Sequence, residues 1–174
     1  QTPRKNIKRE LATSNRRTAQ ALLATMAGMF AVYHGPEGIH RIAVHAHSHT
    51  AAVAEAAKKL GYKLASECFF DTIEVEADAE KVRKIAEEKQ INLFYPNAQS
   101  VRMSFDEVTT LDEVNTVIAI LAEAAGKPTI VLSSIEEKES LCPSMIRESS
   151  NLTHPASNQN PNQTYPTPYT NKLN

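Results

Sequence analysis

The sequence has few of the features that mark several large classes of protein. Its 174 residues include only two cysteines, Cys68 and Cys142, which is too few for a disulfide framework, and the two lack the paired spacing of a zinc site. Neither sign of charge dominates, since 19 basic residues stand against 20 acidic ones. This balance does not favour a polyanionic partner or an anionic membrane surface.

Long hydrophobic runs are also missing. The longest apolar stretch, Ala19–Tyr33, contains Gln20, Thr25 and Gly28 and is shorter than the roughly 20 residues that a bilayer requires. We therefore expect a buried helix and no membrane partner. The first ten residues are basic and polar with no apolar stretch among them, so we expect no signal peptide.

The composition changes near Glu139. Before this residue apolar side chains recur periodically, whereas Ser157–Asn174 consists largely of Asn, Pro, Thr and Gln. Such a segment buries too little to offset the entropy of ordering, so we expect it to be extended or disordered on its own. The predicted organisation is an α/β subdomain over residues 1–138 and a linker with an irregular tail over residues 139–174.

Two long helices are predicted at the start of the subdomain. Thr13 or Ser14 can cap the first, which runs to about Tyr33 and is apolar nearly all round, a pattern typical of buried helices. Gly35 is suited to ending this helix. The next helix is expected to begin at Pro36 and to run to about Leu60, with one apolar face.

The rest of the subdomain alternates between strands and helices. Apolar and polar residues alternate through Cys68–Glu76, which predicts a strand, and Asp78 is placed to cap a short helix. Short strands are expected on either side of a turn at Pro96-Asn97, and a capping box opens a last helix that Gly126 closes. The ranges are Ile91–Tyr95 and Ser100–Phe105 for the strands and Thr110 to Glu113 for the capping box. The order predicts an α/β two-layer unit with a mixed or antiparallel sheet.

Three histidines form the most noticeable cluster of reactive side chains. On a helix, His45 and His49 are neighbours at i,i+4 and could bind a metal, whereas His47 points elsewhere. No zincin glutamate follows His45, and no carboxylate is evident as a third ligand. We therefore favour exposed helix histidines and predict no metal site.

Basic residues are frequent before the first helix, with six of them between Arg4 and Arg17. Aromatic residues do not interleave with them, so we expect no nucleic-acid partner. The lysines of the second and third predicted helices lie on polar faces and are expected to be solvated. They are Lys58, Lys59, Lys81, Lys84 and Lys89.

Several blocks of the sequence closely resemble one enzyme family. The most specific are Lys8-Arg-Glu-Leu-Ala-Thr-Ser-Asn15, Thr18-Ala-Gln-Ala-Leu-Leu-Ala24 and Phe30-Ala-Val-Tyr-His-Gly-Pro-Glu-Gly38. Phe69-Phe-Asp-Thr72, Gln90-Ile-Asn92, Ser104-Phe-Asp-Glu107 and Leu152-Thr-His-Pro155 follow in the same order. These residues resemble glycine dehydrogenase (decarboxylating), the P-protein family of the glycine cleavage system. The resemblance is expected to cover residues 1–155 and to be lost in the tail until Lys172-Leu-Asn174.

The resemblance implies both a fold and an activity. The family has two related halves, each with the fold-type-I architecture of pyridoxal-phosphate enzymes, and only the second half carries the lysine that binds the cofactor. This chain would be the small C-terminal subdomain of the first half. The parent would be an oxidoreductase that decarboxylates glycine and transfers the aminomethyl group to the lipoyl group of the H-protein, in a bacterial cytoplasm or a mitochondrial matrix.

The resemblance also suggests which residues line the parent's active-site cleft. Thr13, Ser14, Asn15 and His154 are candidates for this role, although helix capping explains the first three and a turn before proline explains the fourth. The chain has no Gly-rich phosphate loop, so we expect no catalytic residue and no pyridoxal phosphate bound to this chain alone. The expected partners are the remaining P-protein half or subunit, the H-protein and glycine. A stand-alone α/β binding or regulatory domain is the alternative.

Overall fold

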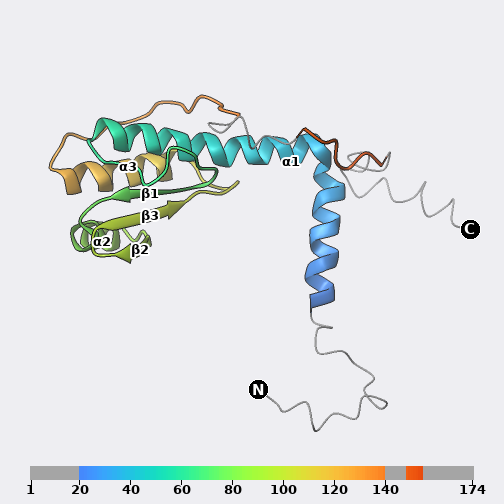
Figure 1. The fold of residues 1–174 in the computed structure, drawn as a ribbon, viewed down its shortest axis with the longest axis horizontal. Coiled ribbons are helices and arrows are strands. Elements are labelled where there is room, and N and C mark those ends of the chain that lie inside the picture. Colours follow the sequence, from blue (N-terminus) through green and yellow to red (C-terminus); the bar gives the residue numbers. More distant parts are fainter. Residues whose placement is uncertain (1–19, 140–147, 155–174) are drawn as a thin grey trace, which may run out of the picture. The chain divides into compact units, whose positions relative to one another are not determined.

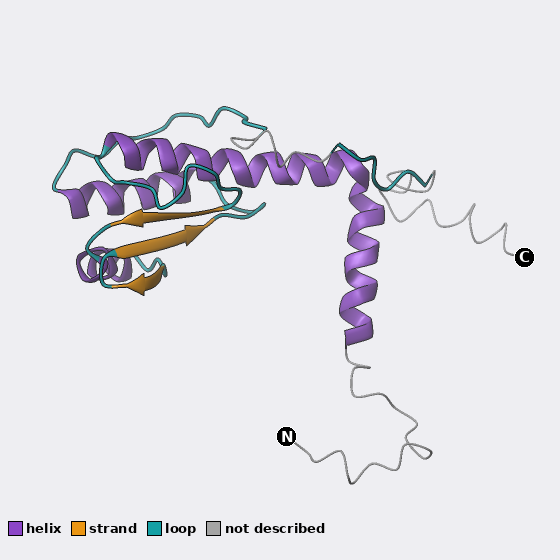
Figure 2. Cartoon of the chain, in the orientation of Figure 1, coloured by secondary structure: helices purple, strands orange, loops and turns teal. Residues whose placement is uncertain are grey.

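The computed structural model describes residues 20–139 and 148–154, and its elements follow the predicted order (Figure 1). A helical stretch comes first, followed by strand, helix, strand, strand and helix (Figure 2). The elements are α1 (Gln20–Lys59), β1 (Thr72–Glu76), α2 (Ala79–Glu88), β2 (Phe94–Asn97), β3 (Ser100–Ser104) and α3 (Leu111–Ala125). This succession confirms the predicted α/β class.

Helix α1 consists of two helices separated by a break at Gly35. The backbone of Gly35 has φ 63° and ψ −176°, which is not helical. A positive φ suits glycine, and Pro36 directly afterwards needs no hydrogen-bond acceptor for an N–H group. The prediction of two helices that meet at Gly35-Pro36 is confirmed.

The chain divides into two compact units, which are described separately. One comprises Gln1–Ile39 together with Ser150–Asn174, and the other comprises His40–Ser149. The predicted division near residue 138 between subdomain and tail stays a prediction. No helix among the described residues has the length and apolar character needed to cross a membrane.

The second unit contains a three-stranded sheet in the order β1-β3-β2, and both pairings are antiparallel. In the central pairing Ile73 lies opposite Met103, and Val75 lies opposite Val101. All four of these side chains are buried. Of the two sheet types that the sequence allowed, the structure has the antiparallel one.

The predicted turn at Pro96-Asn97 is wrong, because both residues belong to β2 and the turn lies at Ala98 and Gln99. β2 is an edge strand, where a proline without an N–H can be tolerated. Asn97 still starts the turn, since its side-chain oxygen accepts a hydrogen bond from the backbone N–H of Gln99 at 2.8 Å.

The predicted caps of α2 and α3 are confirmed, whereas the predicted cap of the first helix at Thr13 or Ser14 lies outside the described residues. The side chain of Asp78 accepts hydrogen bonds from two backbone N–H groups at the start of α2. Thr110 and Glu113 form the capping box of α3, and Gly126 ends this helix in the left-handed conformation with φ 65°. Each cap pairs backbone groups that the helix itself cannot satisfy.

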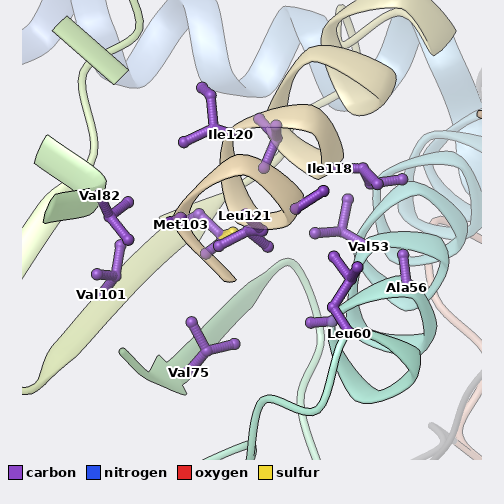
Figure 3. Packing of buried hydrophobic residues seen from close by; sticks show 14 of the residues in the cluster. Val53, Ala56, Leu60, Val75, Val82, Val101, Met103, Ile118, Ile120 and Leu121 are labelled. Atoms are coloured by element: carbon purple, nitrogen blue, oxygen red, sulfur yellow. The ribbon is translucent and has the colours of Figure 1, made fainter. Parts of the chain in front are cut away.

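The core of this unit lies between one face of the sheet and the helices. It joins buried apolar side chains from the second part of α1, from β1 and β3, and from α2 and α3. Figure 3 shows Ile118 of α3 beside Val53 of α1, and Val82 of α2 beside Val101 of β3. The alternation along β1 and β3 leaves their polar residues on the opposite face of the sheet.

Candidate functional site

Only one of the four residues proposed to line a cleft lies within the described part of the chain. Thr13, Ser14 and Asn15 fall outside it, so the structure does not test their role. His154 lies in the described segment 148–154 and is exposed. The assignment of these four residues to a cleft stays a prediction.

The predicted histidine cluster of α1, His45, His47 and His49, is not exposed, contrary to expectation. His47 is 1% exposed and His49 is 7% exposed, and His45 is half-buried. Helix periodicity alone suggested one buried face, but other segments cover this part of α1 as well. Hydrogen bonds join these segments to the helix, from His45 to Thr109, from His47 to Phe70 and between Ser48 and Lys138.

His47 connects α1 to the segment that leads into β1. Its Nδ1 donates a hydrogen bond to the backbone carbonyl of Phe70 at 2.9 Å, and its ring lies parallel to the Phe70 ring. Because a carbonyl oxygen only accepts, Nδ1 carries the proton, and in the neutral ring Nε2 is then an acceptor. This Nε2 is buried and has no hydrogen-bond partner within the described structure. The geometry indicates a structural role for His47.

His45 and His49 lie in contact one turn apart on α1, with their rings tilted by 38°. Their ring centroids lie 4.0 Å apart. His49 Nδ1 donates to the carbonyl of His45 at 2.8 Å, and His45 Nε2 donates to the carbonyl of Thr109 at 3.2 Å. Burial lowers the pKa of His49 below its ordinary value, so its neutral form is favoured.

This pair alone is a poor metal site, because one nitrogen of each ring already donates to a backbone carbonyl. Within residues 20–139 and 148–154, no group of three or more His, Cys, Asp or Glu side chains is suited to hold a metal ion.

The Phe69-Phe-Asp-Thr72 block fastens the start of the sheet. The carbonyl of Phe70 accepts from His47, and the carbonyl of Asp71 accepts from the N–H of Phe105 at 2.9 Å. The hydroxyl of Thr72 lies 2.8 Å from that of Ser104 on β3. These contacts explain the block as a structural junction.

The first part of α1 is exposed in this chain, so the prediction of a buried helix is wrong here. Leu22 is 67% exposed, Met26 57% and Met29 62%. The sequence pattern correctly identified an apolar helix, but none of the described residues covers these side chains.

Comparison with known proteins gives this arrangement a context. The family model of the glycine cleavage system P-protein matches residues 1–121, which is more than half of the chain. The chain belongs to the glycine cleavage system P-protein family. It is 47% identical over 172 residues to a protein of Flavobacterium johnsoniae named glycine dehydrogenase (decarboxylating), covering 99% of the chain and 18% of that relative. A mitochondrial protein of the same name from Pisum sativum is 41% identical over 162 residues, covering 91% of the chain and 15% of the relative.

The chain thus spans less than one fifth of the length of these P-protein relatives. The alignment with the Flavobacterium protein covers 99% of the chain and so includes residues beyond 155, where the motifs were expected to be lost.

A lysine that forms a pyridoxal-phosphate imine must react as a neutral amine, which a desolvated pocket favours. Lys58, Lys59, Lys81, Lys84 and Lys89 are exposed, as predicted. Lys58 pairs with Glu67 at 2.6 Å, Lys89 pairs with Glu123 at 3.1 Å, and Lys138 is engaged by Glu55.

One hollow of the described surface carries acidic side chains. It lies at the ends of β1 and β3 and is lined by Glu74, Glu76 and Asp78 among others. Hydrogen bonds from Arg102 lower the pKa of Glu74, which therefore stays ionised at neutral pH. A phosphate would be repelled in this hollow.

Proposed function

We propose that this chain is a segment of a glycine dehydrogenase (decarboxylating), the P-protein of a glycine cleavage system. The observation that carries this proposal is 47% identity to a protein of that name across 99% of the chain. The longer protein would decarboxylate glycine and pass the remaining aminomethyl group to the lipoyl group of the H-protein. Pyridoxal phosphate would supply the electron sink for the carbanion that decarboxylation leaves.

Within that protein the segment would form the small C-terminal subdomain of the first, cofactor-free half with its fold-type-I architecture. The sheet with helices on one face supports a compact subdomain, and the exposed apolar helix supports contact with further protein. Thr13, Ser14, Asn15 and His154 are proposed to contribute to one wall of the cleft. The lysine that holds the cofactor would lie outside this chain.

The proposed partners follow from the same assignment. They are the remaining P-protein half or subunit, the lipoylated H-protein and glycine. Relatives come from bacteria and from a plant whose protein is named mitochondrial. We therefore propose a bacterial cytoplasm or a mitochondrial matrix as the site of action.

A stand-alone α/β binding or regulatory domain remains the rival proposal. Such a domain should cover its own apolar surface, because large exposed patches favour association. The exposed Leu22, Met26 and Met29 count against this rival.

A segment exchange tests the proposal. This chain replaces the matching segment of the Flavobacterium johnsoniae relative, and glycine-dependent exchange of labelled bicarbonate is measured with lipoylated H-protein. We expect activity comparable to that of the unmodified relative. A folded chimera that binds the cofactor but lacks exchange activity would contradict the assignment.

A second measurement concerns the isolated chain. Pyridoxal phosphate is added, and the imine absorbance is compared with that of the unmodified relative. We expect no imine band from the chain alone. A band that disappears when a particular lysine is replaced would contradict the proposed cofactor-free role.

A further inference from the structure

Four large apolar side chains of the first part of α1, Gln20–His34, share one face, and Leu23, Phe30 and Val32 lie at its flanks. Leu22, Met26, Met29 and Tyr33 follow the i, i+4, i+7, i+11 spacing that places residues on one helix face. Each is more than half exposed, with values of 67%, 57%, 62% and 52%. These four side chains form the Leu/Met face, which none of the described residues covers.

Four small residues lie on the opposite side of the same helix segment. Ala24, Ala27, Gly28 and Ala31 have the i, i+3, i+4, i+7 spacing of a shared face, the Ala/Gly face. The first three are exposed and Ala31 is half-buried. Such a face allows another backbone to come close, whereas the Leu/Met face requires a wider separation.

No contact among the described residues requires a glycine at position 28. A Cβ atom at Gly28 would meet nothing within 4 Å, although glycine is less stable than alanine inside a helix. Gly38 differs, because a Cβ there would lie 2.9 Å from the Cβ of His34. The contact that would favour glycine at position 28 is therefore missing from the described structure.

This helix segment does not require a polar partner. Thr25 donates its hydroxyl to the carbonyl of Ala21 at 2.9 Å, so this group is satisfied within the helix. No charged side chain occurs from Gln20 to Tyr33, and the ring of His34 lies tilted against Phe30 with centroids 4.3 Å apart. The matching surface should be apolar and uncharged.

We propose that Gln20–His34 is held between two apolar surfaces of the remaining P-protein polypeptide. The Leu/Met face packs against side chains of one surface, and the Ala/Gly face contacts a backbone of the other at close range. The remaining polypeptide is the expected partner because the relatives have more than five times as much chain as this protein supplies. This inference rests on the proposed function and names the partner of the segment.

Hydrogen exchange of the backbone amides tests the docking. It compares the isolated chain with the Flavobacterium chimera that contains the same residues. We expect amides of residues 24–34 to exchange on the order of 100-fold more slowly in the chimera, since docking must be undone before they open. Amides of Val53–Leu60, in the core of both proteins, are the internal control.

The outcomes separate this inference from the proposed function. An active chimera with equal exchange rates for residues 24–34 in both proteins would overturn the docking alone. A chimera that lacks activity yet protects the segment would contradict the proposed function and leave the docking supported. Protection in the isolated chain that rises with its concentration would assign the face to a second copy, and protection by neutral lipid vesicles would assign it to a membrane. Either result overturns the proposal.

Gly28→Ala should have opposite effects on this helix segment in the isolated chain and in the chimera. In the isolated chain it should increase helicity, because alanine favours the helix and meets no neighbour. In the chimera it should speed exchange of the segment about tenfold, because the added methyl group separates the close backbones. Thr25→Ala is the matched control, which raises helix propensity without adding bulk and should leave protection in the chimera intact. Protection in the chimera that increases with Gly28→Ala would overturn the close approach.

Discussion

His47 and Phe70 join the helical and sheet layers of the larger unit through one hydrogen bond. The Nδ1 of His47 lies 2.9 Å from the carbonyl oxygen of Phe70, 23 residues further along the chain. The rings of the two residues also lie parallel, with an interplanar angle of 2°. A buried helix side chain thus fixes the point at which the chain enters β1.

Replacing His47 with alanine should destabilise this unit. The change leaves the carbonyl of Phe70 without its donor and removes a ring that is 1% exposed. We expect the free energy of unfolding to fall by about 1–3 kcal/mol, measured by urea denaturation. His40→Ala, at an exposed position of the same helix, should have little effect. Equal losses in the two variants would contradict the structural role of His47.

Stability should depend on the protonation of His49. Burial holds its pKa below the value of about 6.5 expected in the unfolded chain. The unfolded state therefore binds protons first as the pH falls, so the stabilisation is complete above about pH 6.5 and is lost as the pH falls through the folded pKa. Urea midpoints between pH 7.5 and 5 measure this effect. His49→Gln should flatten the decline, and an unchanged pH dependence in this variant would contradict the assignment.

Asn115 fastens the extended chain that follows α3. Its side-chain N–H donates to the carbonyl of Leu132 at 3.0 Å, and its oxygen accepts from the N–H of Leu132 at 2.8 Å. Asn115→Ala should cost about 1–3 kcal/mol for the two bonds together and speed proteolysis of residues 130–138. Asn115→Asp keeps the acceptor and loses the donor, so an intermediate rate is expected. Cleavage at the original rate in both variants would show that other contacts hold this segment.

Gly126 ends α3 with a positive φ of 65°. An alanine there would strain the backbone, although its Cβ would meet no atom within 4 Å. We expect Gly126→Ala to lower the free energy of unfolding by roughly 1–2 kcal/mol. Gly126→Asn should lose less, because asparagine tolerates the left-handed region. Thermal unfolding of the two variants distinguishes this backbone effect from a steric one, for which the larger asparagine would be worse.

Local signals in the sequence predicted most of the fold. The cap at Asp78, the capping box at Thr110 and Glu113, and the glycine at 126 depend on neighbouring residues, so they can be recognised without tertiary information. The turn after β2 was misplaced because Pro96 normally signals a turn. It lies within a strand here, and only the order of the strands shows that this strand is at an edge.

The candidate site was less predictable than the fold. Spacing placed His45 and His49 on one helix face, and the contact between their rings agrees with it. The burial of His47 could not be inferred from the sequence, because it depends on contact with Phe70, which lies 23 residues further along the chain. Phe69 and Phe70, two consecutive aromatic residues before a strand, were the available signal for a covered helix.

The sequence by itself determined the family, the order of the elements and the ends of the last two helices, because motifs, caps and periodicity are local properties of the chain. Tertiary structure decided which apolar surfaces are covered. The second part of α1 meets the sheet and α3, so even His47 and His49 are buried, whereas the first part displays the same kind of apolar side chains with no described residue over them. Burial depends on what lies opposite a surface, and for Gln20–His34 we place that surface in the rest of the P-protein.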